Sequence, residues 1–383
     1  MSEDVQLRRI AKFAYGDALA AGVRRDGSIP VVSSGGVTGS HAEANVRGPS
    51  IVVGRKGSFG SVHWMDEDCF VIDTAYSVVP ANPDIHIRWL YYRLLATDLR
   101  GLSQDVGVPG LSRESAYITR VMPPPSYAEQ QRIAGFLDTE TARIDRLVAM
   151  RRRQLPMLEE RFGEAVGCLF KDFRSARPTR LKYLTRQRPR YGVLVPTFVD
   201  EGVPFVRVND LLDLASRIDG LRRIPLELSQ QYSRTVVKER DILLSVVGTL
   251  GRTVVAPREL IGANIARAVS SLRVRAGVDP YLLAAWTATR SFREQALTAT
   301  STDTAQPTLG MEDLANFRLV WPGDTREQRD GVVALSEIRT ASETLQSAIQ
   351  RQVAVLVERR QALITAAVTG QFDVTTARGA DLS

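Results

Sequence analysis

The chain has 383 residues, of which 44% are hydrophobic and 24% charged. These values predict a globular protein of two or three domains and exclude a fibrous or disordered chain. Fifty Lys and Arg against 43 Asp and Glu give a net charge of +7, which suits nucleic acid but does not demonstrate it. Two cysteines are too few for a disulfide framework or a four-thiolate zinc site.

The first residues carry no basic and apolar leader pattern, and no apolar run approaches the roughly 20 residues that span a bilayer. We therefore expect a soluble, cytoplasmic chain without a membrane partner.

The sequence contains an internal duplication. Short basic and apolar phrases, Leu7–Ala11 and Leu181–Thr185, open the two copies. Each copy continues with a β-branched run that is interrupted by Gly-Ser-Phe-Gly (57–60) or by Gly-Thr-Leu-Gly (248–251). This pattern predicts a tight hairpin in which glycines adopt positive φ.

Later phrases correspond as well, and from Pro109 onward they do so at a constant offset of 198. The matched pairs are Trp89–Tyr92 with Tyr281–Ala284, Pro109–Leu111 with Pro307–Leu309, Val121–Pro124 with Leu319–Pro322, and Glu129–Gln130 with Glu327–Gln328. Each half therefore predicts a mixed, mostly β domain followed by one long helix.

Apolar residues three and four apart mark both predicted helices and form a seam for a partner helix. The seam positions are Leu137, Ile144, Leu147, Leu158 and Phe162 in the first helix, and Ile338, Leu345, Ile349, Val353 and Leu356 in the second. The alternative is that each helix packs on its own domain. Pro156 predicts a kink or break near 154–156 because it removes a helix hydrogen bond.

Between the halves, residues 171–190 contain eight basic residues and one acid. Their excess of +7 equals the net charge of the whole chain, so this stretch is either a phosphate-binding surface or a solvated arginine-rich linker.

Catalytic patterns are absent from the sequence. The three histidines, His41, His63 and His86, form no metal-binding pair, and there is no nucleophile elbow, no Walker A loop and no amino-methyltransferase tetrad. We expect a binding protein without catalytic or metal-ligating residues. A self-contained DNA methyltransferase or nuclease, and a helical scaffold that binds only proteins, are the alternatives.

Five segments resemble parts of the specificity subunits of type I restriction–modification enzymes. The stretches 29–39 and 48–62, with Ile72–Ala75, look like a target recognition domain of that family. The segment 123–138 is similar to the entry into the family's central helical spacer, and Ala367–Asp373 resembles the end of its distal helix.

The resemblance implies an α+β fold in which two mixed, mostly β target recognition domains are separated by two long antiparallel coiled-coil helices, with a pseudo-twofold repeat. The expected boundaries are 1–122 for the first recognition domain, 123–172 for the central spacer helix, 173–320 for the second recognition domain, 321–374 for the distal helix and 375–383 for a tail.

The resemblance further implies a non-catalytic subunit that reads a bipartite target in double-stranded DNA. Two modification subunits would supply S-adenosylmethionine and the methyl-transfer site, and restriction subunits would join for cleavage. This chain itself would bind no cofactor.

DNA contacts are expected from Lys and Arg, from the backbone of glycine turns, and from polar side chains on loops. In the first domain we select Ser33, Ser34, Gly35, Arg55, Lys56 and Ser58. In the second we select Arg186, Arg188, Arg190, Tyr191, Asn209, Thr249, Arg252, Thr304 and Gln306.

Overall fold

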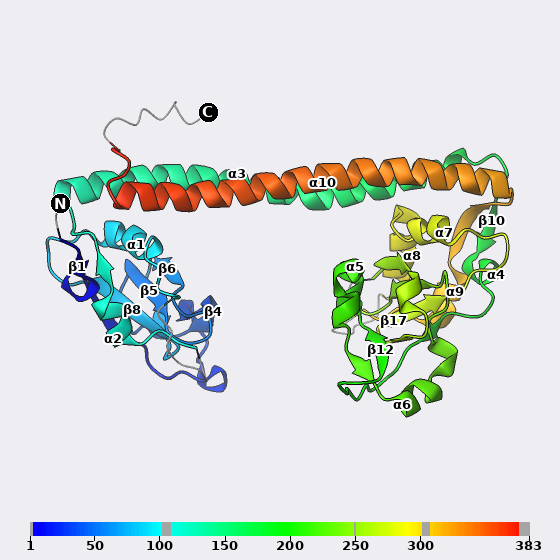
Figure 1. Ribbon diagram of the computed structural model, residues 1–383, viewed down its shortest axis with the longest axis horizontal. Helices are drawn as coiled ribbons and strands as arrows, with labels where there is room; N and C mark the ends of the chain where they lie inside the picture. Colours follow the sequence, from blue (N-terminus) through cyan, green and yellow to red (C-terminus); the bar gives the residue numbers. More distant parts are fainter. Residues whose placement is uncertain (1–2, 102–108, 249, 301–306, 375–383) are drawn as a thin grey trace. The chain divides into compact units, whose positions relative to one another are not determined.

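The computed structural model describes residues 3–101, 109–248, 250–300 and 307–374 and divides into two units (Figure 1). Unit 1 comprises residues 1–152 and 351–383, and unit 2 comprises residues 153–350. Both divisions fall inside long helices, α3 (Tyr127–Asp172) and α10 (Thr325–Val368). Each long helix therefore begins in one unit and ends in the other.

In the described part of unit 1, short strands form a four-stranded sheet, β2-β8-β5-β6, a three-stranded sheet, β4-β3-β7, and the pair β1-β9. The strands are β1 (Val5–Gln6), β2 (Ala11–Tyr15), β3 (Ile29–Ser33), β4 (Gly36–His41), β5 (Ser50–Gly54), β6 (Val62–Met65), β7 (Phe70–Val71), β8 (Ala75–Pro80) and β9 (Arg120–Val121). Strand β5 is buried along its whole length, which explains its β-branched, uncharged sequence.

Two short helices accompany these strands, α1 (Ile87–Leu95) and α2 (Arg113–Ile118). Helix α1 lies between the four-stranded sheet and the first part of α3 (Figure 1). Its Trp89 and Leu90 join Ile133 and Leu137 of α3 and Ile364 of α10 in one core.

Unit 2 repeats these sheets as β11-β17-β14-β15, β13-β12-β16 and β10-β18. Its strands are β10 (Ala176–Arg180), β11 (Arg190–Tyr191), β12 (Val203–Val206), β13 (Arg223–Ile224), β14 (Ile242–Ser245), β15 (Thr253–Val255), β16 (Asn264–Ile265), β17 (Val269–Leu272) and β18 (Arg318–Pro322). Its shorter helices are α4 (Leu181–Leu184), α5 (Leu214–Arg217), α6 (Leu226–Gln231), α7 (Pro280–Trp286), α8 (Arg290–Ala299) and α9 (Met311–Asn316).

The two units share strand order and strand direction. The pairs β3·β4 and β12·β13 are antiparallel, whereas β3·β7 and β12·β16 are parallel. The internal repeat expected from the sequence is therefore present in the topology of the sheets.

The glycine-rich phrases form corresponding hairpins. Strand β5 pairs with β6, and β14 pairs with β15, each antiparallel. Gly57 and Gly60 have φ of 72° and 73°, and Gly248 and Gly251 have φ of 72° and 84°, so the expected positive φ is confirmed. The hairpins are less tight than expected, because residues 55–61 separate β5 from β6.

A buried glutamine marks the start of each long helix. The Gln130 side-chain amide donates to the carbonyls of Asp84 and Pro125 and accepts from the His86 amide. Gln328 makes the same three kinds of bond, with Gly277, Pro322 and the Asp279 amide. This agreement supports the offset of 198 read from the sequence.

The expected pairing of Trp89 with Tyr281 is wrong by one residue. The amide that bonds to the glutamine belongs to His86 in unit 1 and Asp279 in unit 2, so Trp89 corresponds to Leu282. Trp89 and Leu282 are both buried, whereas Tyr281 is 50% exposed. The sequence pairs Trp89 with Tyr281 because both are aromatic, whereas the hydrogen bonds of the two glutamines pair Trp89 with Leu282.

The long helices pack antiparallel within each unit. In unit 1, Asp145 of α3 forms an ion pair with Arg360 of α10 at 3.0 Å, and the ring of Phe136 contacts that of Phe372. In unit 2, Glu327 near the start of α10 accepts bonds from Arg174 and Ser175, which follow the end of α3. Residues of each helix also join the core of the neighbouring domain. The helices therefore pack both on each other and on the domains.

Seam positions differ in burial. Leu137 and Ile144 are buried, and Leu158, Phe162, Ile338, Ile349, Val353 and Leu356 are half-buried. Leu147 and Leu345, by contrast, are 38% and 52% exposed, so they do not lie on a covered stripe. In α3 the buried neighbour is Val148, because with 3.6 residues per turn position 148 lies closer than position 147 to the face that carries Leu137 and Ile144.

Helix α3 is continuous through Pro156, so of the expected kink or break the break does not occur. Pro156 and Arg152, whose carbonyl the missing amide would have bonded, are both exposed. Water can therefore satisfy that carbonyl, which limits the cost of the proline. The helices also differ from the expected spans, since α3 begins at Tyr127 and α10 covers Thr325–Val368.

Candidate nucleic-acid interface

In unit 1 the turn between β3 and β4 meets the loop between β5 and β6. A Cβ on Gly54 would lie 2.3 Å from the Ser58 carbonyl oxygen and 3.1 Å from Ser34 Cβ. The hydroxyl of Ser61 donates to the carbonyls of Ser34 and Ser58. Glycine at position 54 therefore allows the two segments to form one surface.

Arg55 lies at the edge of this surface and is held by two kinds of contact. Its Nη1 donates to the Asp73 carbonyl at 3.1 Å, and its guanidinium lies 4.9 Å from the centre of the Tyr15 ring. Arg113 approaches the same ring to 5.0 Å. Tyr15 is 50% exposed, so two cations share one accessible aromatic ring.

Sequence reasoning missed Tyr15 and Arg113. They are 40 and 58 residues from Arg55 in the chain, and no local motif connects them. Burial raises the pKa of the neighbouring Tyr76 to about 12, and its hydroxyl donates to the Leu111 carbonyl. Tyr76 is thus a packing residue under the cluster rather than part of its surface.

The other residues selected in unit 1 divide into two groups. Gly35, Lys56 and Ser58 are exposed and available to a ligand. Ser33 is half-buried and bonds within its own turn, to the Gly36 carbonyl and the Gly35 amide, and Ser34 is buried. The turn serines therefore shape the loop, while the exposed group can reach a ligand.

Unit 2 has the same frame, meaning the same strand pairings and backbone hydrogen bonds, but carries different side chains on it. The Leu111 amide donates to the backbone carbonyl of Arg55 in unit 1, and the Leu309 amide donates to that of Val246 in unit 2. Val246 and Val247 therefore occupy the positions of Arg55 and Lys56. The Asp73 amide donates to the backbone carbonyl of Asp17, and the Arg267 amide donates to the backbone carbonyl of Val193. Exposed Arg267 therefore takes the place of Asp73.

Three of the eight basic side chains at 171–190 make polar contacts with other side chains of unit 2. Arg180 and Lys182 both donate to the side chain of Asn316, and Arg188 forms an ion pair with Glu312 at 2.9 Å. Arg186 is exposed, and Arg190 is half-buried on β11. The excess of positive charge read from the sequence is thus only partly available to a ligand.

The hydroxyl of Tyr191 donates to the Leu309 carbonyl, and burial raises its pKa. Since Leu309 corresponds to Leu111, Tyr191 supports in unit 2 the carbonyl that Tyr76 supports in unit 1. Asn209 is exposed on a 3-10 helix (Val208–Leu212), and Arg252 is half-buried beside the hairpin. Thr249, Thr304 and Gln306 lie outside the described residues.

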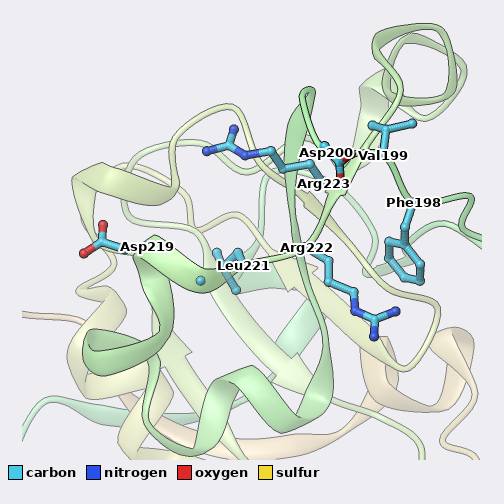
Figure 2. A pocket seen from close by; sticks show the side chains of 8 residues that line it. Phe198, Val199, Asp200, Asp219, Leu221, Arg222 and Arg223 are labelled. Atoms are coloured by element: carbon cyan, nitrogen blue, oxygen red, sulfur yellow. The ribbon is translucent and has the colours of Figure 1, made fainter. Parts of the chain in front are cut away.

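A cavity of about 500 Å³ opens on the surface of unit 2 and was not expected from the sequence. Figure 2 shows the side chains that line it. They come from the loop before β12 and from the segment that enters β13: Phe198, Val199, Asp200, Asp219, Leu221, Arg222 and Arg223.

No group of three or more His, Cys, Asp or Glu side chains could hold a metal ion in the part of the chain that the structure describes. Over the same residues, no helix is both long and apolar enough to cross a membrane.

Comparisons with known proteins agree with this architecture. Residues 2–155 match the type I restriction modification DNA specificity domain. The type I restriction enzyme EcoBI specificity subunit of Escherichia coli is 27% identical over 352 residues, which are 84% of this chain and 73% of the relative.

One similar solved structure comes from work on complex assembly and conformational transition of the type I restriction–modification system. It is 17% identical, with a TM-score of 0.59 over 96% of this chain and 98% of that one. The chain is therefore similar to the specificity subunits of type I restriction–modification systems, and residues 2–155 match their DNA specificity domain.

Proposed function

We propose that each unit reads one half of a bipartite target in double-stranded DNA for a type I restriction–modification system. The observation that carries the proposal is the repeated frame with different side chains at equivalent positions. Arg55 and Lys56 in unit 1 are replaced by Val246 and Val247 in unit 2, whereas Asp73 is replaced by Arg267. Two readers built on one frame, with cations at different places, suit an asymmetric target.

Within each unit the accessible cations would contact phosphates and the loops would contact base edges. In unit 1 these are Arg55 and Arg113 beside Tyr15 and the exposed Lys56, with Gly35 and Ser58 on the adjoining loops. In unit 2 they are Arg186, Arg190, Arg252 and Arg267, with Asn209.

The chain's own role is non-catalytic in this proposal. Two modification subunits would dock on the helices and bring S-adenosylmethionine and the methyl-transfer site, and restriction subunits would add cleavage. Its homology to the EcoBI specificity subunit supports this division of labour. Helices α3 and α10 would fix the distance between the half-sites.

Selection from a random duplex library, using the full chain with the subunits that copurify with it, tests the proposal. We expect two short conserved blocks separated by a gap of constant length. Binding should weaken with salt, with log K falling by about 0.9 per phosphate contact for each tenfold rise.

A double variant, Arg55→Ala with Lys56→Ala, should bind more weakly and show a shallower salt dependence. Glu129→Gln, an exposed change on α3, serves as the control. Recovery of unrelated sequences by the assembled complex would refute the proposal.

A further inference from the structure

The cavity of unit 2 lies beside an exposed apolar loop. In the segment between β11 and β12, Leu194 and Val195 are 56% and 80% exposed, and Phe198 and Val199 are each 38% exposed. Four accessible apolar side chains within six residues are unusual for a solvated loop and mark a binding surface.

Arg222 is held in place on this surface. Its guanidinium lies 4.7 Å from the centre of the Phe198 ring (Figure 2). Phe198 in turn contacts the buried ring of Phe205 at 5.8 Å, and the Phe205 amide donates to the Arg222 carbonyl. Among the described residues no carboxylate forms an ion pair with Arg222.

A cation–π contact of this kind attracts the guanidinium to the ring. It occupies no N–H group of the arginine, so the planar fork can still donate two parallel bonds. Arg223 acts differently, since its Nη1 donates to the Gly202 carbonyl and braces the loop. Arg222 is therefore the arginine of the pair that remains available to a ligand.

Unit 1 places a guanidinium at the same position of its frame. Counting from the equivalent strand residues Ile29 and Val203, Arg24 corresponds to Phe198. Arg24 bonds to the Thr38 carbonyl and lies against Gly39, and Gly39 corresponds to Arg222 in the paired strand. The arginine next to this strand position comes from the loop in unit 1, whereas in unit 2 the strand segment itself carries it.

The other side chains that line the cavity favour contact with bases of DNA over contact with its phosphates. Asp200 and Asp219 also line the cavity, and carboxylates repel phosphate groups. At base edges a carboxylate can accept from the cytosine amino group, and apolar side chains can contact the thymine methyl group.

We propose that Arg222, held by its cation–π contact with Phe198, donates a bidentate pair of hydrogen bonds to the O6 and N7 acceptors of a guanine in the half-site read by unit 2. The inference rests on the proposed function and adds a specificity-determining residue that the sequence did not indicate.

The test compares the full chain with Arg222→Ala, Arg222→Lys and Phe198→Leu, each assembled with its copurifying subunits and bound to the selected target. At one guanine of one half-site, discrimination against other bases should fall by about 5- to 150-fold in Arg222→Ala. Arg222→Lys should lose most of it as well, because an ammonium cannot make the planar pair. Phe198→Leu should lose part of it.

The half-site read by unit 1 provides an internal control for folding and assembly, and its preferences should stay unchanged in all three variants. Uniform weakening over all sequences, with rescue by Arg222→Lys, would mean a phosphate contact and overturn the inference. Unchanged discrimination in Arg222→Ala would also overturn it, and both outcomes leave the proposed function standing. If the unaltered chain selected no sequence, the proposed function itself would fail.

Discussion

At the scale of single residues, the two units keep the groups that build the frame and exchange the groups that face outward. Gln130 and Gln328 make the same buried bonds, whereas Asp73 and Arg267 carry opposite charges at one position. Buried polar groups resist change because an unpaired partner costs about 1–3 kcal/mol. Exposed side chains have no such constraint and are free to determine specificity.

The glutamines should be equally important for stability. Gln130→Ala leaves two carbonyls and one amide without a side-chain partner, and Gln328→Ala does the same in unit 2. We expect each change to cost about 2–3 kcal/mol in the free energy of unfolding, measured by chemical denaturation of the full chain. Exposed Gln131→Ala and Gln352→Ala are matched controls. A loss in only one of the two buried variants would contradict their equivalence.

Acid should weaken the junction at the start of α10. Bonds from the side chain and amide of Ser175 lower the pKa of Glu327 below its ordinary value of 4.5. Because the folded pKa is the lower one, the stabilisation is present above the unfolded pKa and is lost as the pH falls through the folded pKa.

Glu327→Gln should therefore melt at a lower temperature than the unaltered chain near pH 6, and the difference should shrink as the pH falls below 4.5. Thermal melts at a series of pH values measure this, with Glu129→Gln at the corresponding position of α3 as the control. A difference that stays constant with pH would contradict the assignment.

At the scale of elements, periodicity predicted the long helices but could not fix their buried faces. Leu147 and Leu345 fit the spacing yet are exposed, because burial depends on which neighbour lies against each turn. Pro156 gives a second example, since the sequence predicts a kink or break near 154–156 and an exposed turn of a continuous helix contains the proline. In the hairpins, by contrast, the glycines fixed local geometry directly.

Helix length should control the gap between half-sites. Inserting seven residues into α3 after Arg152 and seven into α10 after Gln350 lengthens each by about 10.5 Å and nearly preserves the apolar face. At 3.4 Å per base pair, the selected gap should grow by about three base pairs.

The bases within each block should stay the same in the doubly extended chain. An insertion in α10 alone should impair folding or binding, since the antiparallel contacts would lose their register. If the double insertion left the gap unchanged, the helices would not act as a spacer.

At the scale of the whole molecule, each globular part begins and ends in a paired strand. Strand β1 pairs with β9 in unit 1, and β10 pairs with β18 in unit 2. The ends of each part therefore lie together, which favours exchange of the part as a block. The sequence-based boundary at residue 320 would cut β18, so the structure moves it to Pro322.

Exchange of residues 1–122 for the equivalent segment of a relative should alter one half-site and leave the other unchanged. Exchange of 176–322 should do the opposite. Sequencing of selected duplexes measures both, and melting of each chimera checks that it folds, because the first core also includes residues of α3 and α10. A chimera in which both half-sites change would contradict independent readers.

The sequence by itself determined the duplication, the long helices, the glycine hairpins and the family resemblance. These features depend on local spacing, on glycine's access to positive φ and on repeated phrases in fixed order. Only the tertiary structure decided that Arg113 and Tyr15 join Arg55, that Arg180 and Lys182 bond to Asn316, and that Arg222 stacks on Phe198. The physical reason is that contacts between residues far apart in the chain depend on how sheets and loops pack, and no local pattern encodes them.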